Sequence, residues 1–318
     1  MDSLPSDYFY KLFQFTPRQH HDVYPAIDPL NPELSLADKV ILVTGASRGI
    51  GATGIVPSLA MAGAAGIVLV ATNVEKLGAV ELVVRGISPS TRVLIAAADI
   101  SNEDSVARVF KNATEVFGRV DVLVHNAGVM NKMGNIHEED AKIWWKQYVC
   151  HCSSTTMLTH TLLIRWIQEI NTLGTFLVSR YFINSLPSLD SPAVIIYVST
   201  GAAWVSNALS AGYSGSKLAA QKLISDISAG YPNIVTISIS PGLVETDMLQ
   251  IKNFDIDTPE LVGGTVVWLT GERARFLNGR AISTNWNVED LVARKEEIQR
   301  EDLLTIKMAG KFGHEQFT

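Results

Sequence analysis

Two side chains in the second half of the chain have the types and spacing of an acid–base pair. Tyr213 and Lys217 stand four residues apart in the run YSGSK, so on a helix both project from one face. A free tyrosine has a pKa near about 10, and a neighbouring ammonium lowers that pKa by favouring the phenolate. Such a pair suits proton exchange with a carbonyl or alcohol oxygen. The alternative is a solvated helix face, which is the commoner setting for this spacing.

Hydroxyl side chains precede this pair at the end of an apolar run. Ser199 and Thr200 follow residues 194–198, which predict a buried strand. Adjacent residues of a strand face opposite sides, so only one of the two hydroxyls can face the pair.

A glycine-rich turn near the start of the chain predicts a nucleotide site. The first apolar run leads directly into the sequence TGASRGIG of residues 44–51, and a helix is expected to follow. Glycines let the backbone approach a pyrophosphate, and a helix N-terminus offers free N–H groups and a positive dipole end. A purely structural turn is the alternative. Asp99 and Asn126 follow the third and fourth predicted strands, where ligands of open α/β sheets bind, although both residue types also cap helices and form turns.

The residues after the second predicted strand favour NADP(H) over NAD(H). A carboxylate at this position holds the ribose 2′-hydroxyl of NAD, whereas a nearby basic residue accommodates the 2′-phosphate of NADP. Here the strand ends in Ala71-Thr72-Asn73, without a carboxylate, and Arg48 is the available cation. Arg48 as a solvated turn residue is the alternative.

Six apolar runs are positioned to carry these residues. They are nearly continuous in apolar residues, as strands covered on both faces must be, and they span residues 40–44, 67–71, 93–97, 122–124, 194–198 and 234–239. Amphipathic segments such as 104–117 alternate with them. This order predicts one α/β domain, a Rossmann-like doubly wound parallel sheet in three α/β/α layers. We place it at residues 38–290, with an N-terminal extension at 1–37 and a C-terminal extension at 291–318.

The composition excludes several classes of protein. The 318 residues are 47% hydrophobic and 18% charged, with a net charge of -6, so a large core is possible and nucleic acid is not an expected partner. Residues 49–74 are uncharged, but Pro57 and several glycines interrupt them, so no membrane span is expected. Residues 1–37 lack the apolar run of a signal peptide, which predicts a cytoplasmic protein.

The order of these motifs resembles the short-chain dehydrogenase/reductase (SDR) family from about residue 39 to 286, especially filamentous-fungal members with an N-terminal extension. The resemblance implies that the glycine turn holds the cofactor phosphates through Gly45, Ser47, Arg48, Ile50 and Gly51. It implies that Asp99 contacts the adenine, that Asn126 borders the ribose, and that Val244 and Thr246 contact the carboxamide and pyrophosphate. It further implies that Tyr213 exchanges the proton, while Lys217 binds the nicotinamide ribose and lowers the pKa of Tyr213. Asn171 would belong to a proton relay to the lysine.

The substrate-orienting residue departs from the family pattern. In the family a serine usually lies thirteen residues before the tyrosine, which is the position of Thr200. Threonine keeps the hydroxyl but adds a methyl group and stiffens the side chain. We therefore assign this role to Thr200, with Ser199 as the substitute.

Residues 149–168 interrupt the helix that the family pattern predicts. Removing these twenty residues restores a helix in which Trp144, Tyr148 and Asn171 fall at i, i+4 and i+7. Val149-Cys150 can be encoded by GTATGT, Leu158-Thr159 by a CTAAC-type branch site and Gln168 by CAG, so the segment reads as a retained intron. A genuine insertion loop, or a metal site of Cys150, His151, Cys152 and His160, are the alternatives, although this cysteine spacing is atypical of structural zinc. No metal is expected, and sequencing of the spliced transcript decides between these interpretations.

These features together predict an NADP(H)-dependent oxidoreductase that interconverts a ketone or aldehyde and an alcohol on a small hydrophobic molecule. The apolar residues of the loop at 243–258 suit such a substrate, namely Met248, Leu249, Ile251 and Phe254. The fungal resemblance implies secondary metabolism, and the family implies a homodimer or homotetramer. The alternative is a non-catalytic dinucleotide-binding or interaction protein.

Overall fold

The computed structural model describes residues 4–130, 137, 169–206, 210–248 and 253–310. Its centre is a seven-stranded parallel sheet in the order β3-β2-β1-β4-β5-β6-β7. The strands are β1 Val40–Thr44, β2 Gly66–Ala71, β3 Arg92–Ala97, β4 Val122–His125, β5 Ala193–Val198, β6 Ile234–Ser240 and β7 Arg280–Ser283. The chain reverses its direction of travel between β1 and β4, which is where open sheets of this kind bind ligands.

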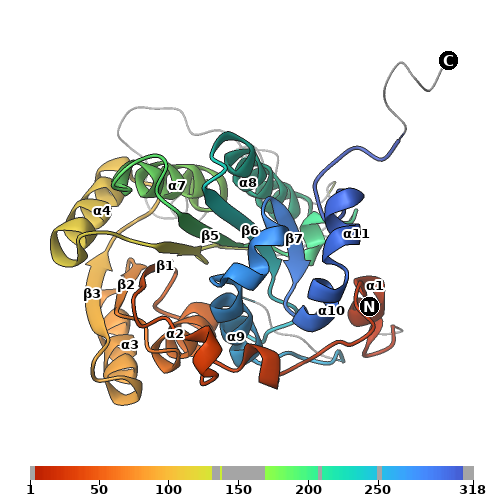
Figure 1. Ribbon diagram of the computed structural model, residues 1–318, viewed down its shortest axis with the longest axis horizontal. Helices are drawn as coiled ribbons and strands as arrows, with labels where there is room; N and C mark the ends of the chain where they lie inside the picture. Colours follow the sequence, from red (N-terminus) through yellow and green to blue (C-terminus); the bar gives the residue numbers. More distant parts are fainter. Residues whose placement is uncertain (1–3, 131–136, 138–168, 207–209, 249–252, 311–318) are drawn as a thin grey trace.

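Helices cover both faces of this sheet (Figure 1). One face carries α4 Glu103–Phe117, α7 Gly174–Ser185 and α8 Ala211–Gly230, and the other carries α2 Val56–Met61, α3 Val74–Ile87 and α9 Pro259–Leu269. The short helices α1 Tyr8–Leu12, α10 Val288–Ala293 and α11 Lys295–Arg300 lie at the β7 side of the molecule. The three-layer fold predicted from the sequence is therefore confirmed.

Local chemistry explains where the helices begin and end. Asn73, Asn102 and Thr258 cap α3, α4 and α9 by accepting backbone N–H bonds in the first turn. Gly118 ends α4 with a φ of 83°, a left-handed conformation that favours glycine. Before α2, residues Gly51–Ile55 form a wider π-helical turn. The cause is Pro57, which has no N–H to donate and whose ring would clash with the carbonyl four residues earlier.

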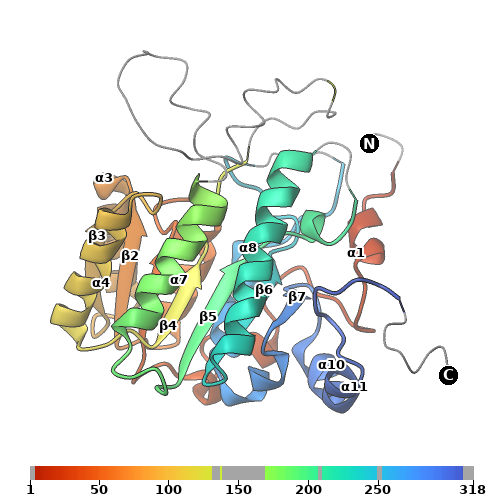
Figure 2. The ribbon, with the colours of Figure 1, turned by 90° about the horizontal axis from the view of Figure 1, so that it is seen from above.

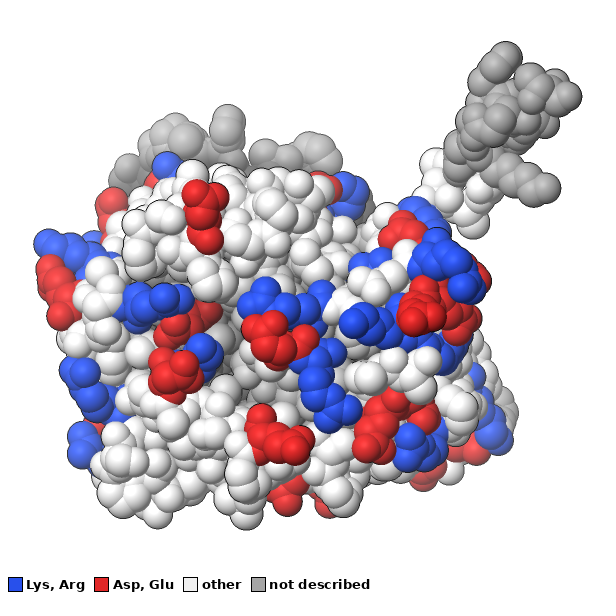
Figure 3. All heavy atoms as spheres, in the orientation of Figure 1, with Lys and Arg blue, Asp and Glu red and all other residues white. Residues whose placement is uncertain are grey.

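Alternate strand residues face two separate hydrophobic cores. Ile41 and Val43 face the core under α2, α3 and α9, whereas Leu42 faces the core under α4, α7 and α8. Parts of both extensions join the first core, because Ile27 and Ile298 are fully buried there. On the face drawn in Figure 3, basic and acidic side chains are interspersed. Exposed ion pairs contribute little, so the two cores dominate the stability.

Candidate active site

The glycine turn after β1 is locked to the loop after β4. Gly45 has a φ of 66°, and a Cβ there would lie 2.8 Å from the Cα of Ala127. The Nδ2 of Asn126 donates to the carbonyls of Thr44 at 3.3 Å and Gly45 at 3.1 Å. Gly49, with a φ of 53°, completes the turn. No side chain projects from positions 45 and 49, and both glycines line the cleft with their backbone.

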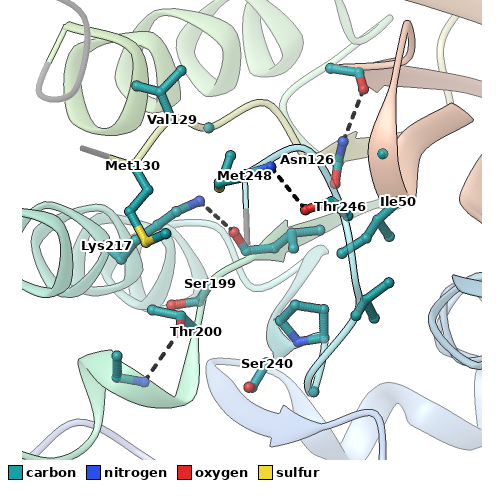
Figure 4. A pocket seen from close by; sticks show the side chains of 18 of the residues that line it. Ile50, Asn126, Val129, Met130, Ser199, Thr200, Lys217, Ser240, Thr246 and Met248 are labelled. Carbon is teal, nitrogen blue, oxygen red and sulfur yellow. Dashed lines mark hydrogen bonds between the residues drawn. The ribbon is translucent and has the colours of Figure 1, made fainter. Parts of the chain in front are cut away.

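A cleft of about 520 Å³ runs along the carboxyl edge of the sheet. It brings together twelve of the residues singled out in the sequence: Gly45, Ser47, Arg48, Ile50, Asp99, Asn126, Ser199, Thr200, Tyr213, Lys217, Val244 and Thr246. Figure 4 shows one part of it, with Thr200 and Lys217 on one side and Ile50 and Thr246 on the other. The motifs scattered along the sequence therefore line one cavity.

Gly51 and Asn171 do not line this cleft. A Cβ on Gly51 would lie 2.3 Å from the carbonyl oxygen of Gly45, so this glycine permits close packing of the turn on its own helix. This packing adds a structural role to Gly51, and its contact with the cofactor phosphates stays a prediction.

Asn171 is fully buried and clamps two elements together behind the cleft. It lies in the π-helical turn Glu169–Leu173 that precedes α7. Its side chain accepts the N–H of Val129 and donates to the Val129 carbonyl, both at 3.0 Å, and also donates to the Ser216 hydroxyl at 3.0 Å. The loop after β4 and helix α8, which carries Tyr213 and Lys217, are thereby held in register.

The two hydroxyls at the end of β5 point to different partners. Thr200 hydrogen-bonds the Tyr213 hydroxyl and accepts the N–H of Ala202 at 3.3 Å. Ser199 is buried and donates to the Oε1 of Gln221 at 2.8 Å. Thr200 is therefore the hydroxyl placed beside the tyrosine, as strand alternation requires.

Burial shifts the proton affinities of the Tyr–Lys pair in opposite directions. Burial raises the pKa of Tyr213 to about 12, with the hydrogen bond from Thr200 acting in the opposite direction. Burial also lowers the pKa of Lys217 to about 7. Its ammonium donates to the Val198 carbonyl at 2.8 Å (Figure 4). The sequence predicted a lowered tyrosine pKa, whereas in this structure desolvation raises it and outweighs the opposing hydrogen bond of Thr200. Tyr213 consequently holds its proton at neutral pH.

The cofactor-selecting end of the cleft contains Arg48 and no carboxylate from β2. Thr72 lines the cleft, and the Asn73 side chain is occupied as the cap of α3, accepting the N–H of Lys76 at 2.8 Å. The Arg48 side chain is 56% exposed, and its nearest carboxylate contact is to Asp247 at 4.0 Å. Arg48 is therefore a largely exposed cation that lines this end of the cleft and makes a long ion pair with Asp247.

Asp99 lies at the same end of the cleft. One of its carboxylate oxygens accepts the N–H and the hydroxyl of Ser101, at 2.9 and 2.7 Å. The turn role and the lining role of this residue thus coexist.

The turn at Pro241-Gly242 depends on a buried carboxylate. Gly242 has a φ of 76°, and a Cβ there would lie 2.1 Å from the Oδ2 of Asp257. That same oxygen accepts the N–H of Leu243 at 2.6 Å. Asp257 thereby fixes the turn that leads into Val244 and Thr246.

Replacing Gly242 by alanine is expected to lower the free energy of unfolding by about 3 kcal/mol, combining left-handed strain with overpacking. Gly63 is the matched control, because its φ is 74° but a Cβ would meet nothing within 4 Å. Gly63→Ala should cost only about 1 kcal/mol. Urea unfolding of both variants measures the difference, and equal losses would contradict the steric argument.

Three features of the site were missed in the sequence. Gly49 was not named as a binding residue, although it belongs to the glycine-rich motif of residues 44–51 and could have been found from that motif. Asp257 and the N-terminal aromatic residues that line the cleft, Phe9 and Phe13 among them, have no local signal of this kind. Other expectations lie outside the described residues: Trp144, Tyr148, the segment 149–168 with its candidate metal ligands, Leu249 and Ile251.

Fold and site together define a dinucleotide-binding α/β protein, and comparisons with known proteins identify its family. Residues 39–256 match the family described as short chain dehydrogenase. The short chain dehydrogenase pigC of Monascus ruber is 32% identical over 317 residues, covering 95% of each chain. A short-chain type dehydrogenase/reductase from Mycobacterium ulcerans has the same fold, with a TM-score of 0.67 at 23% identity over 78% of this chain and 89% of that one. A Shigella flexneri short chain dehydrogenase complexed with NADP gives a TM-score of 0.65 at 22% identity, covering 80% and 99%.

The chain belongs to the short-chain dehydrogenase/reductase family, oxidoreductases that act on CH–OH groups with NAD(P). The family resemblance inferred from the motifs is confirmed. Among the residues that the structure describes, no helix is long and apolar enough to cross a membrane.

Proposed function

We propose that this protein is an NADP(H)-dependent reductase of a ketone or aldehyde on a small hydrophobic molecule. The observation that carries the proposal is the Thr200–Tyr213–Lys217 cluster inside a cleft whose other end is the open glycine turn. Similarity to fungal short chain dehydrogenases such as pigC supports a place in secondary metabolism.

The side chains divide the chemistry between them. Thr200 donates a hydrogen bond to the carbonyl oxygen, and Tyr213, protonated at neutral pH, delivers the proton to that oxygen. Lys217 would border the ribose of a bound cofactor, while Asn171 holds α8 against the loop after β4. The bound nicotinamide supplies the hydride. The side-chain-free turn at Gly45 and Gly49 fits a dinucleotide, with Ser47, Ile50, Asp99, Asn126, Val244 and Thr246 as its further contacts.

The preference for NADP(H) rests on Arg48. Replacing Arg48 by alanine is expected to raise the KM for NADPH by about ten- to a hundredfold, because a charge-assisted hydrogen bond contributes about 1.5–3 kcal/mol. The KM for NADH should stay unchanged. Arg108→Ala on α4 is the control, since Arg108 bonds Ser105 on its own helix. An equal rise for both cofactors would contradict a phosphate-binding role.

Two further expectations remain part of the proposal. We infer a homodimer or homotetramer, as the family commonly forms, and the mass in solution by light scattering tests this.

We also propose that the chain consists of an extension at residues 1–37, a domain at 38–290 and a second extension at 291–318, with 149–168 as a retained intron. Complementary DNA that lacks these twenty codons would support the intron, and a mature message that encodes Cys150 would contradict it.

The experiment that tests the proposed function is NADPH oxidation across a panel of hydrophobic ketones and aldehydes. The full chain and a variant without residues 149–168 are compared, each with NADPH and NADH. We expect turnover with NADPH in at least one of the two forms. Cofactor binding without turnover by either form would instead support a non-catalytic dinucleotide-binding protein.

A further inference from the structure

The N-terminal segment, residues 4–21, reaches the cleft although it lies outside the motifs of the family. Phe9, Leu12 and Phe13 line the cleft on its outer side, together with Met248 and Phe254 of the loop after β6. Helix α1 carries the first two of these residues and lies near the carboxyl edge of the sheet, on the β7 side (Figure 2).

Phe13 comes close to the reacting side chains. A Cβ on Gly201, the residue directly after Thr200, would lie 3.0 Å from the Phe13 ring. The Phe13 ring also meets the Trp204 ring edge-on, with ring centroids 5.8 Å apart. The Phe9 and Phe254 rings pack together with their centroids 5.0 Å apart. The rings of Phe9, Phe13 and Phe254 thus form an aromatic wall of the cleft, with Phe13 beside Gly201.

Backbone contacts after β7 hold this wall in place. Gln19 and Trp286 form an antiparallel bridge, and the N–H of His20 donates to the Asn285 carbonyl at 2.9 Å. The indole N–H of Trp286 donates to the carbonyl of Phe13 itself at 2.7 Å. These bonds are all made within the protein and restrain the segment, which lowers the entropic cost of binding a ligand there.

Buried Asp257 connects the aromatic wall to the turn at Pro241-Gly242, which leads into Val244 and Thr246. Besides the N–H of Leu243, its carboxylate accepts the Tyr10 hydroxyl and the Asn285 Nδ2, both at 2.8 Å, and contacts the His21 Nδ1 at 3.1 Å. One carboxylate thus joins the N-terminal segment, the turn before Val244 and Asn285, the second residue after β7. A displacement of the N-terminal segment would therefore move the turn at Gly242, and a displacement of that turn would move the segment.

The residues that line the cleft around Phe9, Phe13 and Phe254, its outer part, indicate the chemistry of the substrate. Within the part of the chain that the structure describes, the charged residues lining the cleft are Arg48, Asp99, Lys217 and Asp247. Three of these lie at the cofactor end and Lys217 lies beneath Tyr213, so a charge on the substrate would be buried against apolar side chains without compensation. Flat aromatic rings instead favour a flat apolar partner.

We propose that residues 4–21 form a substrate-binding element in which Phe9 and Phe13 select a neutral, flat, hydrophobic carbonyl compound. Asp257 and Tyr10 are positioning residues for this element. The inference rests on the proposed carbonyl reductase function and specifies its substrate class.

Paired ketones test the selection. Phe9→Leu and Phe13→Leu keep apolar volume but remove the flat faces, and Phe117→Leu on α4 is the matched control. The double variant should raise the KM for 2-tetralone about tenfold, while the KM for cyclohexanone and the Kd for NADPH stay unchanged. The wild type should also turn over methyl 4-oxocyclohexanecarboxylate at least a hundredfold more efficiently than the free acid. Tyr10→Phe should raise the KM for 2-tetralone more than it lowers kcat.

Calorimetric binding of 2-tetralone to the NADP⁺-loaded protein separates this inference from the proposed function, because that complex cannot react. If binding weakens in the double variant and no ketone is turned over, the substrate-binding role of residues 4–21 would be supported and the reductase function contradicted. Turnover with the KM and Kd unchanged by both substitutions would uphold the reductase and overturn the wall. Absent binding of 2-tetralone to the wild type, or a preference for the free acid, would also overturn the wall.

Discussion

Replacing Tyr213 by phenylalanine is expected to lower kcat for carbonyl reduction by about a thousandfold, within the range of a lost general acid. The hydroxyl, which is hydrogen-bonded to Thr200, is the proton donor that we propose, and its raised pKa of about 12 keeps it protonated. The ring stays in place, so packing and the Kd for NADPH should change little. Stopped-flow NADPH oxidation and fluorescence titration measure the two quantities.

Tyr181→Phe on α7 is the control for this experiment, because its hydroxyl bonds Glu103 on the surface. Wild-type kcat is expected for that variant. If Tyr213→Phe retained more than a tenth of the wild-type kcat, another group would have to supply the proton.

Replacing Lys217 by methionine is expected to stabilise the protein at neutral pH while abolishing turnover. Burial lowers the pKa of Lys217 from its usual 10.5 to about 7, a cost of roughly 5 kcal/mol at neutral pH. The variant loses one hydrogen bond to the Val198 carbonyl, which offsets about 1–3 kcal/mol of that gain. The free energy of unfolding should therefore rise by about 2–4 kcal/mol, measured in urea at pH 7.

The same pKa shift predicts how this difference varies with pH. Between about pH 7 and 10.5 the unfolded chain carries the Lys217 proton and the folded chain does not. The unfolded state then binds more protons, so the wild type gains stability as the pH rises through this window, and methionine does not. The advantage of Lys217→Met should shrink between pH 7.5 and 9.5. Lys222→Met, at an exposed lysine of the same helix, should show no such trend. If the advantage of Lys217→Met stayed constant over this pH range, the lowered pKa of buried Lys217 would be contradicted.

Much of the fold could be predicted because its strands are short, apolar and covered on both faces. Six predicted runs match β1 to β6 to within one residue at each end. The seventh strand, Arg280–Ser283, was missed because only four residues form it and both of its ends are polar. Its identity depends on parallel pairing with β6, which no local pattern encodes.

The cofactor turn and the Tyr–Lys pair were predictable for a similar reason. Each motif is contiguous in sequence, and the parallel sheet places the carboxyl ends of its strands at one edge. The pKa of Tyr213 was not predictable, because it depends on how completely the surrounding protein excludes water from the cleft.

The substrate end could not be predicted because its contacts join distant segments. Tyr10 and Asp257 are separated by 247 residues, and the Phe13 ring meets Gly201 only in the folded chain. The N-terminal residues also carry no periodic signal beyond scattered aromatic side chains. Their position shows that residues outside the segment that matches the family can line the cleft.

The most direct test of the central claim is the transfer of deuterium from NADPH labelled at C4 of the nicotinamide. The full-length wild type, or the form without residues 149–168, is incubated with a neutral hydrophobic ketone, and the alcohol is analysed by mass spectrometry. We predict one deuterium at the carbinol carbon of the product, and no labelled product from Tyr213→Phe over the same time. Cofactor that stays bound while every ketone is recovered unreduced would contradict the assignment of this cleft as a reductase site.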